Sequence, residues 1–175
     1  MYSVVLLVGP GLLTLAFGAF MLQHAAFLAN SSTPHGILSL QMTYAVEDAR
    51  VILSSWSREE ARHAELSLYW DMGFAIAYGM FLSALSRWSL SGRSRVALVT
   101  AWIPILATMA DLSENLFHLM FLDTIQNGAG IVVGAFVLGG FLFASTKWCL
   151  LASWSVLFLS GLAGRVFRHA VRKPD

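Results

Sequence analysis

The amino-acid sequence predicts an all-α fold, a polytopic membrane helix bundle with four transmembrane helices in one integral membrane domain. Of the 175 residues, 57% are hydrophobic and only 12% are charged, whereas about 25% are charged in an ordinary soluble domain. Several apolar runs approach or exceed the roughly 20 residues with which a helix crosses a bilayer. The ionisable residues within one of these runs recur at helical spacing, which indicates a spanning helix with one polar face.

The first span is predicted at about residues 4–28. Its start lacks basic residues and its apolar stretch is longer than the hydrophobic region of a signal peptide, so we expect the span to be retained. Between about residues 34 and 56, apolar and polar side chains fall on opposite faces. This pattern predicts an outer amphipathic helix that lies on the membrane surface or across the top of the bundle.

The second and third spans are predicted at about residues 66–88 and 96–122. The tetrapeptide Ser57-Arg-Glu-Glu60 has the pattern of a capping box, with Ser57 as N-cap and Glu60 as the third helical residue. The helix that starts there is polar at first and becomes the second span. A short loop with several arginines then leads into the third span.

The remainder of the chain is apolar from residue 131 to 164, apart from Lys147 and a few small polar residues. As a helix this stretch would be about 51 Å long, which is long for one span and short for two. We predict a fourth span at about 146–168, preceded by a Gly-rich apolar extension at 128–145 that is helical or re-entrant. The alternative is five spans, with a turn at residues 145–147.

Basic residues predict the orientation, because Lys and Arg concentrate in short cytoplasmic segments. Seven of the eleven Lys and Arg residues lie in the loop at 87–95 and in the C-terminal tail. Placing both segments inside predicts that both termini lie in the cytoplasm. The expected location is the plasma (inner) membrane. A five-span chain would instead export the basic tail.

One polar stripe inside the third span organises the candidate site. Asp111, Glu114, Asn115 and His118 fall within an arc of about 100° on one helix face. An ionisable side chain near the middle of a bilayer costs at least about 2.5–3.5 kcal/mol. The stripe is therefore expected to face protein or trapped water rather than lipid.

Each span is predicted to contribute a polar group to the outer half of the membrane, which suggests one shared site. Estimated depths from the helical rise place residues from all four spans there. Three carboxyl groups are candidates for acid/base chemistry, and the others are candidates for binding. The predicted acid/base residues are Glu114, Asp111 and Asp71, and the predicted binding residues are Asn115, His118, Lys147, His24 and Tyr78.

Structural explanations compete with these assignments. The stripe could serve as interhelical glue, Lys147 could extend to the interface, and Tyr78 could be a core residue. Glu60-x-x-His63 has the spacing used in di-iron bundles, but a second such motif is missing. The single cysteine, Cys149, excludes an intrachain disulfide and a Cys-based zinc site. We therefore predict neither a metal nor a cofactor.

The predicted function is a binding or accessory role, in which the outer-half pocket takes a small cation, a proton or a lipid headgroup. One alternative is a small membrane enzyme that acts on a lipid or isoprenoid by carboxylate acid/base chemistry. Another is a proton-coupled carrier assembled as an oligomer. The expected partners are membrane lipid, a small cation or lipophilic substrate, and further copies or another subunit. A net charge of +1 gives no support for nucleic-acid binding.

Three short patterns carry a resemblance: Asp71-x-x-Phe74-x-x-x-Tyr78, Asp111-x-x-Glu114-Asn115 and Lys147-Trp148. Together they resemble a set of small multi-pass bacterial membrane proteins of unassigned function, over about residues 66–165. The resemblance implies a shared polar site between spans and no particular activity.

Overall fold

The computed structural model describes residues 2–31, 33–90, 95–126 and 133–171. The described residues form helices joined by short loops, without a strand, which confirms the all-α class. Four helices are long and apolar enough to cross a membrane, so the protein is an integral membrane protein. These helices are α1 (Tyr2–Ala25), α4 (Arg58–Ser89), α5 (Arg95–Gln126) and α6 (Val133–Val171).

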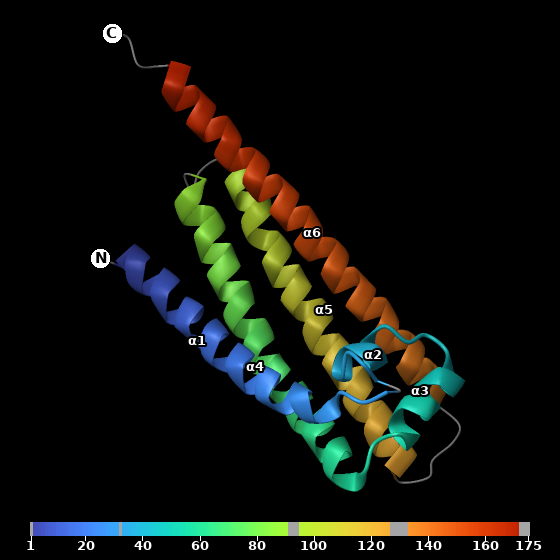
Figure 1. The fold of residues 1–175 in the computed structure, drawn as a ribbon. Helices are drawn as coiled ribbons and strands as arrows, with labels where there is room; N and C mark the ends of the chain where they lie inside the picture. The colour runs from blue at the N-terminus through green and yellow to red at the C-terminus, as the bar shows by residue number, and fades with distance from the viewer. Residues whose placement is uncertain (1, 32, 91–94, 127–132, 172–175) are drawn as a thin grey trace.

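The long helices pack in chain order, with extensive contacts between α1 and α4, α4 and α5, and α5 and α6. Figure 1 shows α1 and α6 on the two flanks and α4 and α5 between them. The start of α1 and the end of α6 lie at the same end of the bundle, which we call the terminal end. The shorter helices α2 and α3 cover the opposite, distal end.

The distal end differs from the single amphipathic helix predicted at 34–56. The structure has a 3-10 turn, η1 (Ala26–Leu28), and two short helices, α2 (Ile37–Gln41) and α3 (Val46–Ser54). The buried face of α2 includes Ile37 and Leu40, and that of α3 includes Ala49 and Ile52. On one continuous helix these faces would point roughly 120° apart. The break between the helices turns both faces toward the same core.

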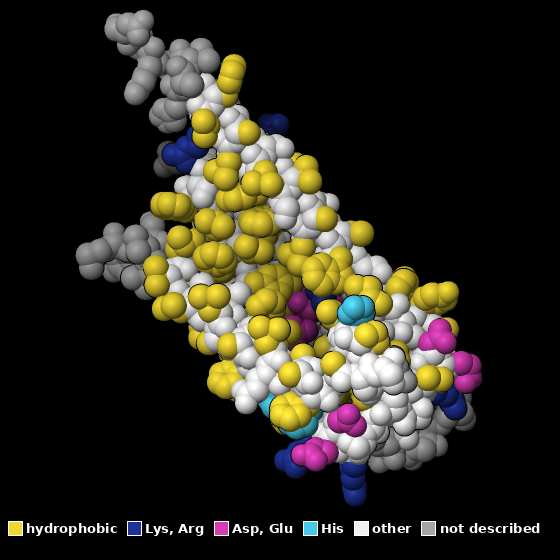
Figure 2. Space-filling model, in the orientation of Figure 1, with side chains coloured by type: hydrophobic (Ala, Val, Ile, Leu, Met, Phe, Trp, Pro, Cys, Tyr) yellow, Lys and Arg dark blue, Asp and Glu magenta, His cyan; other side chains and the backbone are white. Residues whose placement is uncertain are grey.

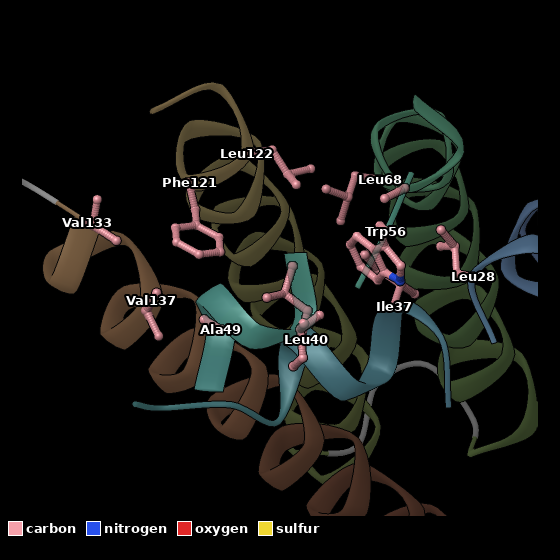
Figure 3. Packing of buried hydrophobic residues seen from close by; sticks show 12 residues of the cluster. Leu28, Ile37, Leu40, Ala49, Trp56, Leu68, Phe121, Leu122, Val133 and Val137 are labelled. Carbon is pink, nitrogen blue, oxygen red and sulfur yellow. The ribbon is translucent and has the colours of Figure 1, made fainter. Parts of the chain in front are cut away.

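That distal core joins residues far apart in the sequence. The indole of Trp56 donates a hydrogen bond to Thr33 Oγ1 (3.3 Å), and the Thr33 hydroxyl donates to the carbonyl oxygen of Leu28 (2.7 Å). These bonds hold the segment around α2 over the ends of the long helices. Figure 3 shows the apolar members of the core, Leu28, Ile37, Leu40, Ala49, Trp56, Leu68, Phe121, Leu122, Val133 and Val137.

The predicted capping box at the start of α4 is confirmed. The backbone N–H of Glu60 donates to Ser57 Oγ (3.2 Å), and the backbone N–H of Ser57 donates to Glu60 Oε2 (2.6 Å). Two backbone donors that the first turn leaves without helical partners are satisfied in this way. The cap fixes where α4 begins.

Helix α6 is continuous through residues 145–147, so the turn required by a five-span chain does not form. Its 39 residues span about 58 Å, which is longer than the roughly 30 Å hydrocarbon core of a bilayer. The distal turns of α6 bury Val133 and Val137 in the core beneath α2 and α3. The Gly-rich extension, in its described part from residue 133, is therefore a helical continuation of the fourth span.

We expect the close approach of α4 and α5 at Gly79 to be a weak point for substitution. A Cβ atom there would lie 2.0 Å from Thr108 Oγ1, whose hydroxyl donates to the carbonyl oxygen of Ala75 (2.9 Å). Gly79→Ala should lower the free energy of unfolding by about 1–3 kcal/mol, because the threonine must move and lose this bond. Thermal unfolding in detergent measures the effect. Gly9→Ala is the matched control, since a Cβ at Gly9 meets nothing within 4 Å; an equal loss in both variants would contradict this account.

Candidate functional site

The centre of the candidate site is an ion-paired lysine. Lys147 Nζ on α6 lies 2.9 Å from Asp111 Oδ1 and 2.7 Å from Glu114 Oε2, both on α5. The two carboxylates are three residues apart on a helix, so they project from adjacent turns of one face and can share a single ammonium. All three side chains are buried. A buried charge requires such partners, because its desolvation penalty is large.

Two hydrogen bonds between buried side chains join helix α4 to helix α5 beside this ion-paired group. The Tyr78 hydroxyl donates to Asp111 Oδ2 (3.0 Å), and Asn115 Nδ2 donates to Asp71 Oδ2 (3.0 Å). Asp111 therefore accepts from a tyrosine on one side and from Lys147 on the other. The predicted stripe on α5 contacts α4 through one edge and α6 through the other.

His118 lies one turn beyond Glu114 on α5, against Gly140 of α6. Its Nε2 is 3.9 Å from Glu114 Oε1, and neither ring nitrogen has a hydrogen-bond partner within the described residues. A Cβ atom on Gly140 would lie 2.6 Å from the imidazole, so the histidine fits against α6 only because this residue has no side chain. Close packing of His118 against Gly140 therefore fills the space between this end of the polar stripe and α6.

A cavity of about 610 Å³ opens beside the polar group. Four of the predicted site residues, Asp71, Tyr78, Asp111 and Lys147, line it, whereas Glu114, Asn115 and His118 do not. Figure 2 shows acidic and basic side chains at the bottom of a hollow that is bordered by hydrophobic side chains. Its apolar walls include Met21, Leu22 and Ala25 of α1, Ile37 and Leu38 of α2, Leu68, Phe74 and Leu82 of α4, and Trp148 and Leu151 of α6.

His24, the residue predicted to represent the first span, is not among the residues that line the cavity. Its Nδ1 lies 2.9 Å from Nδ1 of His63 on α4, and the ring of Phe27 stacks on His63 with centroids 4.3 Å apart. The first span therefore contributes an apolar wall to the cavity, whereas its buried ionisable groups come from α4, α5 and α6. The exposed His35, just before α2, also lines the cavity.

Several cavity residues were not assigned to the site from the sequence. Trp148 entered the sequence analysis only through the pattern Lys147-Trp148, and Gln41 of α2 was not singled out. The adjacency of Trp148 to Lys147 was the available signal for the tryptophan. No sequence signal identifies α2 as part of the wall, because its position depends on the break at residues 42–45.

The site has no recognisable metal-binding geometry. Across the described ranges, no group of three or more His, Cys, Asp or Glu side chains is placed to hold a metal ion. Comparison of the chain with models of known protein families, with curated proteins and with solved structures finds no match. Interpretation of the site therefore depends on its own chemistry.

Removing the lysine should destabilise the bundle strongly. Lys147→Met leaves Asp111 and Glu114 buried without a cation, and we expect the free energy of unfolding to fall by about 3–5 kcal/mol. Adding Glu114→Gln should restore part of this loss, because one buried carboxylate is then removed. Denaturation of the single and double variants in detergent measures the coupling.

Thr146→Val is the control for the Lys147 variants. Thr146 is exposed, and its hydroxyl bonds to the carbonyl oxygen of Leu142 within the same helix. The Thr146→Val variant should unfold like the wild type. If the losses from Lys147→Met and Glu114→Gln simply added in the double variant, the ion pair would not be the source of the effect.

Proposed function

We propose that this protein binds the polar head of a membrane-dissolved amphiphile in the cavity between α1 and α6. The supporting observation is the cavity itself, with apolar walls and with Asp71, Asp111 and Lys147 together at one place. Its volume falls within the range of about 300–1,000 Å³ that is typical of small-molecule sites. Apolar walls with a few convergent polar groups suit a ligand that has a hydrocarbon part and a polar head.

The position of the hollow supports access from the membrane. It lies on the long side of the bundle, between the flanking helices α1 and α6 and next to α2 at the distal end. Exposed apolar side chains such as Leu15 and Leu22 of α1 suit contact with lipid tails. A ligand dissolved in the bilayer could therefore reach the site without leaving the hydrocarbon region.

The proposal includes an orientation in the plasma membrane. Among the described residues, the terminal end of the bundle carries Arg87, Arg95 and Arg165. The distal end carries three arginines and a larger number of acids, namely Arg50, Arg58, Arg62, Glu47, Asp48, Glu59, Glu60 and Glu65. With the basic C-terminal tail, this distribution supports an orientation in which both termini lie in the cytoplasm and the cavity lies in the outer half of the membrane.

Binding is favoured over catalysis by how the carboxylates are used. Asp111 already accepts from Tyr78 and Lys147, and Glu114 does not line the cavity. A general acid or base must come within hydrogen-bond distance of its substrate, so Asp71 is the carboxyl best placed for such a role. An enzyme that acts on a lipid through Asp71 is the second candidate.

We expect the wild-type protein in nanodiscs to retain at least one of three radiolabelled twelve-carbon probes, which are dodecanol, dodecanoate and dodecyltrimethylammonium. Gly18→Leu should weaken retention about tenfold or more, because Gly18 lines the cavity and the new side chain fills it. Gly9→Leu places the same side chain on the same helix where a Cβ meets nothing within 4 Å. This control should bind normally. Failure of the wild type to retain any probe would refute the proposed function.

A separate experiment tests the orientation. Alkaline phosphatase fused after residue 175 should be inactive, and green fluorescent protein fused there should fluoresce, because the basic tail is expected in the cytoplasm. The same fusions before residue 1 should behave identically. Active phosphatase at either terminus would contradict the proposed topology.

A further inference from the structure

We infer that the head group taken by this cavity is positively charged, so that the ligand is a single-chain amine or quaternary ammonium amphiphile. The inference rests on the proposed function and specifies its ligand class. It depends on three features of the cavity: the balance of charge, the use already made of Lys147, and the aromatic rings in the wall.

The buried polar group contains more acidic than basic side chains. Asp71, Asp111 and Glu114 contribute three carboxyl groups, and Lys147 contributes one ammonium that contacts the last two. Asp71 lines the cavity and accepts a hydrogen bond from Asn115, and no ion pair to it is found in the described part of the chain. A cation in the cavity would give this carboxylate the partner that a buried charge requires.

Lys147 is poorly suited to recruit an anionic head. Its ammonium lies within 3 Å of two carboxylate oxygens, at 2.9 Å from Asp111 and 2.7 Å from Glu114. A negatively charged ligand would therefore approach a compensated lysine while it also approached Asp71. Like charges repel strongly where the effective dielectric constant is low. The electrostatic preference of the cavity is for a positive charge.

Three aromatic side chains line the same cavity as Asp71. Phe74, Tyr78 and Trp148 all line the cavity, and the first two rings pack at 59° with centroids 5.4 Å apart. Lys147 Nζ lies 5.5 Å from the ring centroid of Trp148, within cation–π range. Aromatic faces next to a carboxylate are a known means of recognising ammonium groups. The rings thus favour the same class of ligand as the charge balance does.

The apolar walls indicate where the hydrocarbon chain would lie. Leu82 of α4 and Leu151 of α6 line the cavity on the side of Asp71 and Lys147 that is nearer the terminal end, and Met21 and Leu22 of α1 line it as well. With its head at Asp71, a single alkyl chain would lie along these residues toward the middle of the membrane. Burial of this chain provides affinity that does not depend on the head group.

The test compares probes that differ only in the head. Wild-type protein in nanodiscs of zwitterionic lipid is loaded with radiolabelled dodecyltrimethylammonium, and unlabelled dodecyltrimethylammonium, dodecanol and dodecanoate compete for the site. Because the quaternary head keeps its charge at every pH, protonation of the probe cannot influence the result. We expect the cation to compete at least about tenfold more strongly than dodecanol, and dodecanoate to compete most weakly.

Two variants test whether the preference for a cationic head group arises from the residues of this cavity. Asp71→Asn should weaken binding of the cation about tenfold and leave binding of dodecanol unchanged, because only the ion pair is lost. Phe74→Leu should weaken binding of the cation about three- to tenfold with little effect on dodecanol, and it supplies a result if Asp71→Asn fails to fold. Glu59→Gln removes an exposed carboxylate near the start of α4 and should bind all probes like the wild type.

The outcomes separate the two proposals. If the three probes compete equally, or if dodecanoate competes best, the charge preference is wrong and binding of an amphiphile stands. Unchanged binding of the cation in both Asp71→Asn and Phe74→Leu would also overturn the inference. If wild-type protein retains none of the probes, the proposed function and the inference are both refuted.

Discussion

The fold depends on the need to partner a lysine ammonium inside an apolar bundle. Lys147 lies among side chains that offer little other solvation, so α6 must place it beside Asp111 and Glu114 of α5. Hydrogen bonds from Tyr78 to Asp111 and from Asn115 to Asp71 then fix α4 against α5. A rotation or sliding of any of these three helices would leave a buried charge without its partner. The polar stripe thereby determines the relative register of α4, α5 and α6.

The first helix is held by a different kind of contact. The ring of Phe17 packs against Gly73 and, with its centroid 5.9 Å away, against Trp70 of α4. These contacts are apolar, and they place α1 on the side of α4 away from α5. Because α6 packs on the far side of α5, the faces of α1 and α6 near the polar stripe remain apart. Helix α2 closes the distal end of the space between α1 and α6, and this space is the cavity.

Within this cavity, structural and functional demands on the polar residues can be distinguished. Lys147 pairs with both Asp111 and Glu114 and so joins α6 to α5, which is the role expected of interhelical polar residues. Asp71 differs, since it faces the cavity, accepts one hydrogen bond from an amide and lies among aromatic rings. A structural role alone would not require an open apolar space beside this carboxylate. The stripe on α5 can therefore stabilise the bundle while Asp71 on α4 remains available for the binding role proposed above.

The sequence by itself determined the helical class, the four apolar helices, the capping box at Ser57, and the stripe from Asp111 to His118, because each follows from local composition or from helical periodicity. Tertiary structure decided which of these groups meet. It placed His24 beside His63, divided the amphipathic segment into α2 and α3, and paired Glu114 with Lys147 at a position that does not line the cavity. Helical spacing gives the face on which a residue lies, whereas the identity of its neighbour depends on how helices distant in the chain rotate and slide to satisfy buried charges together.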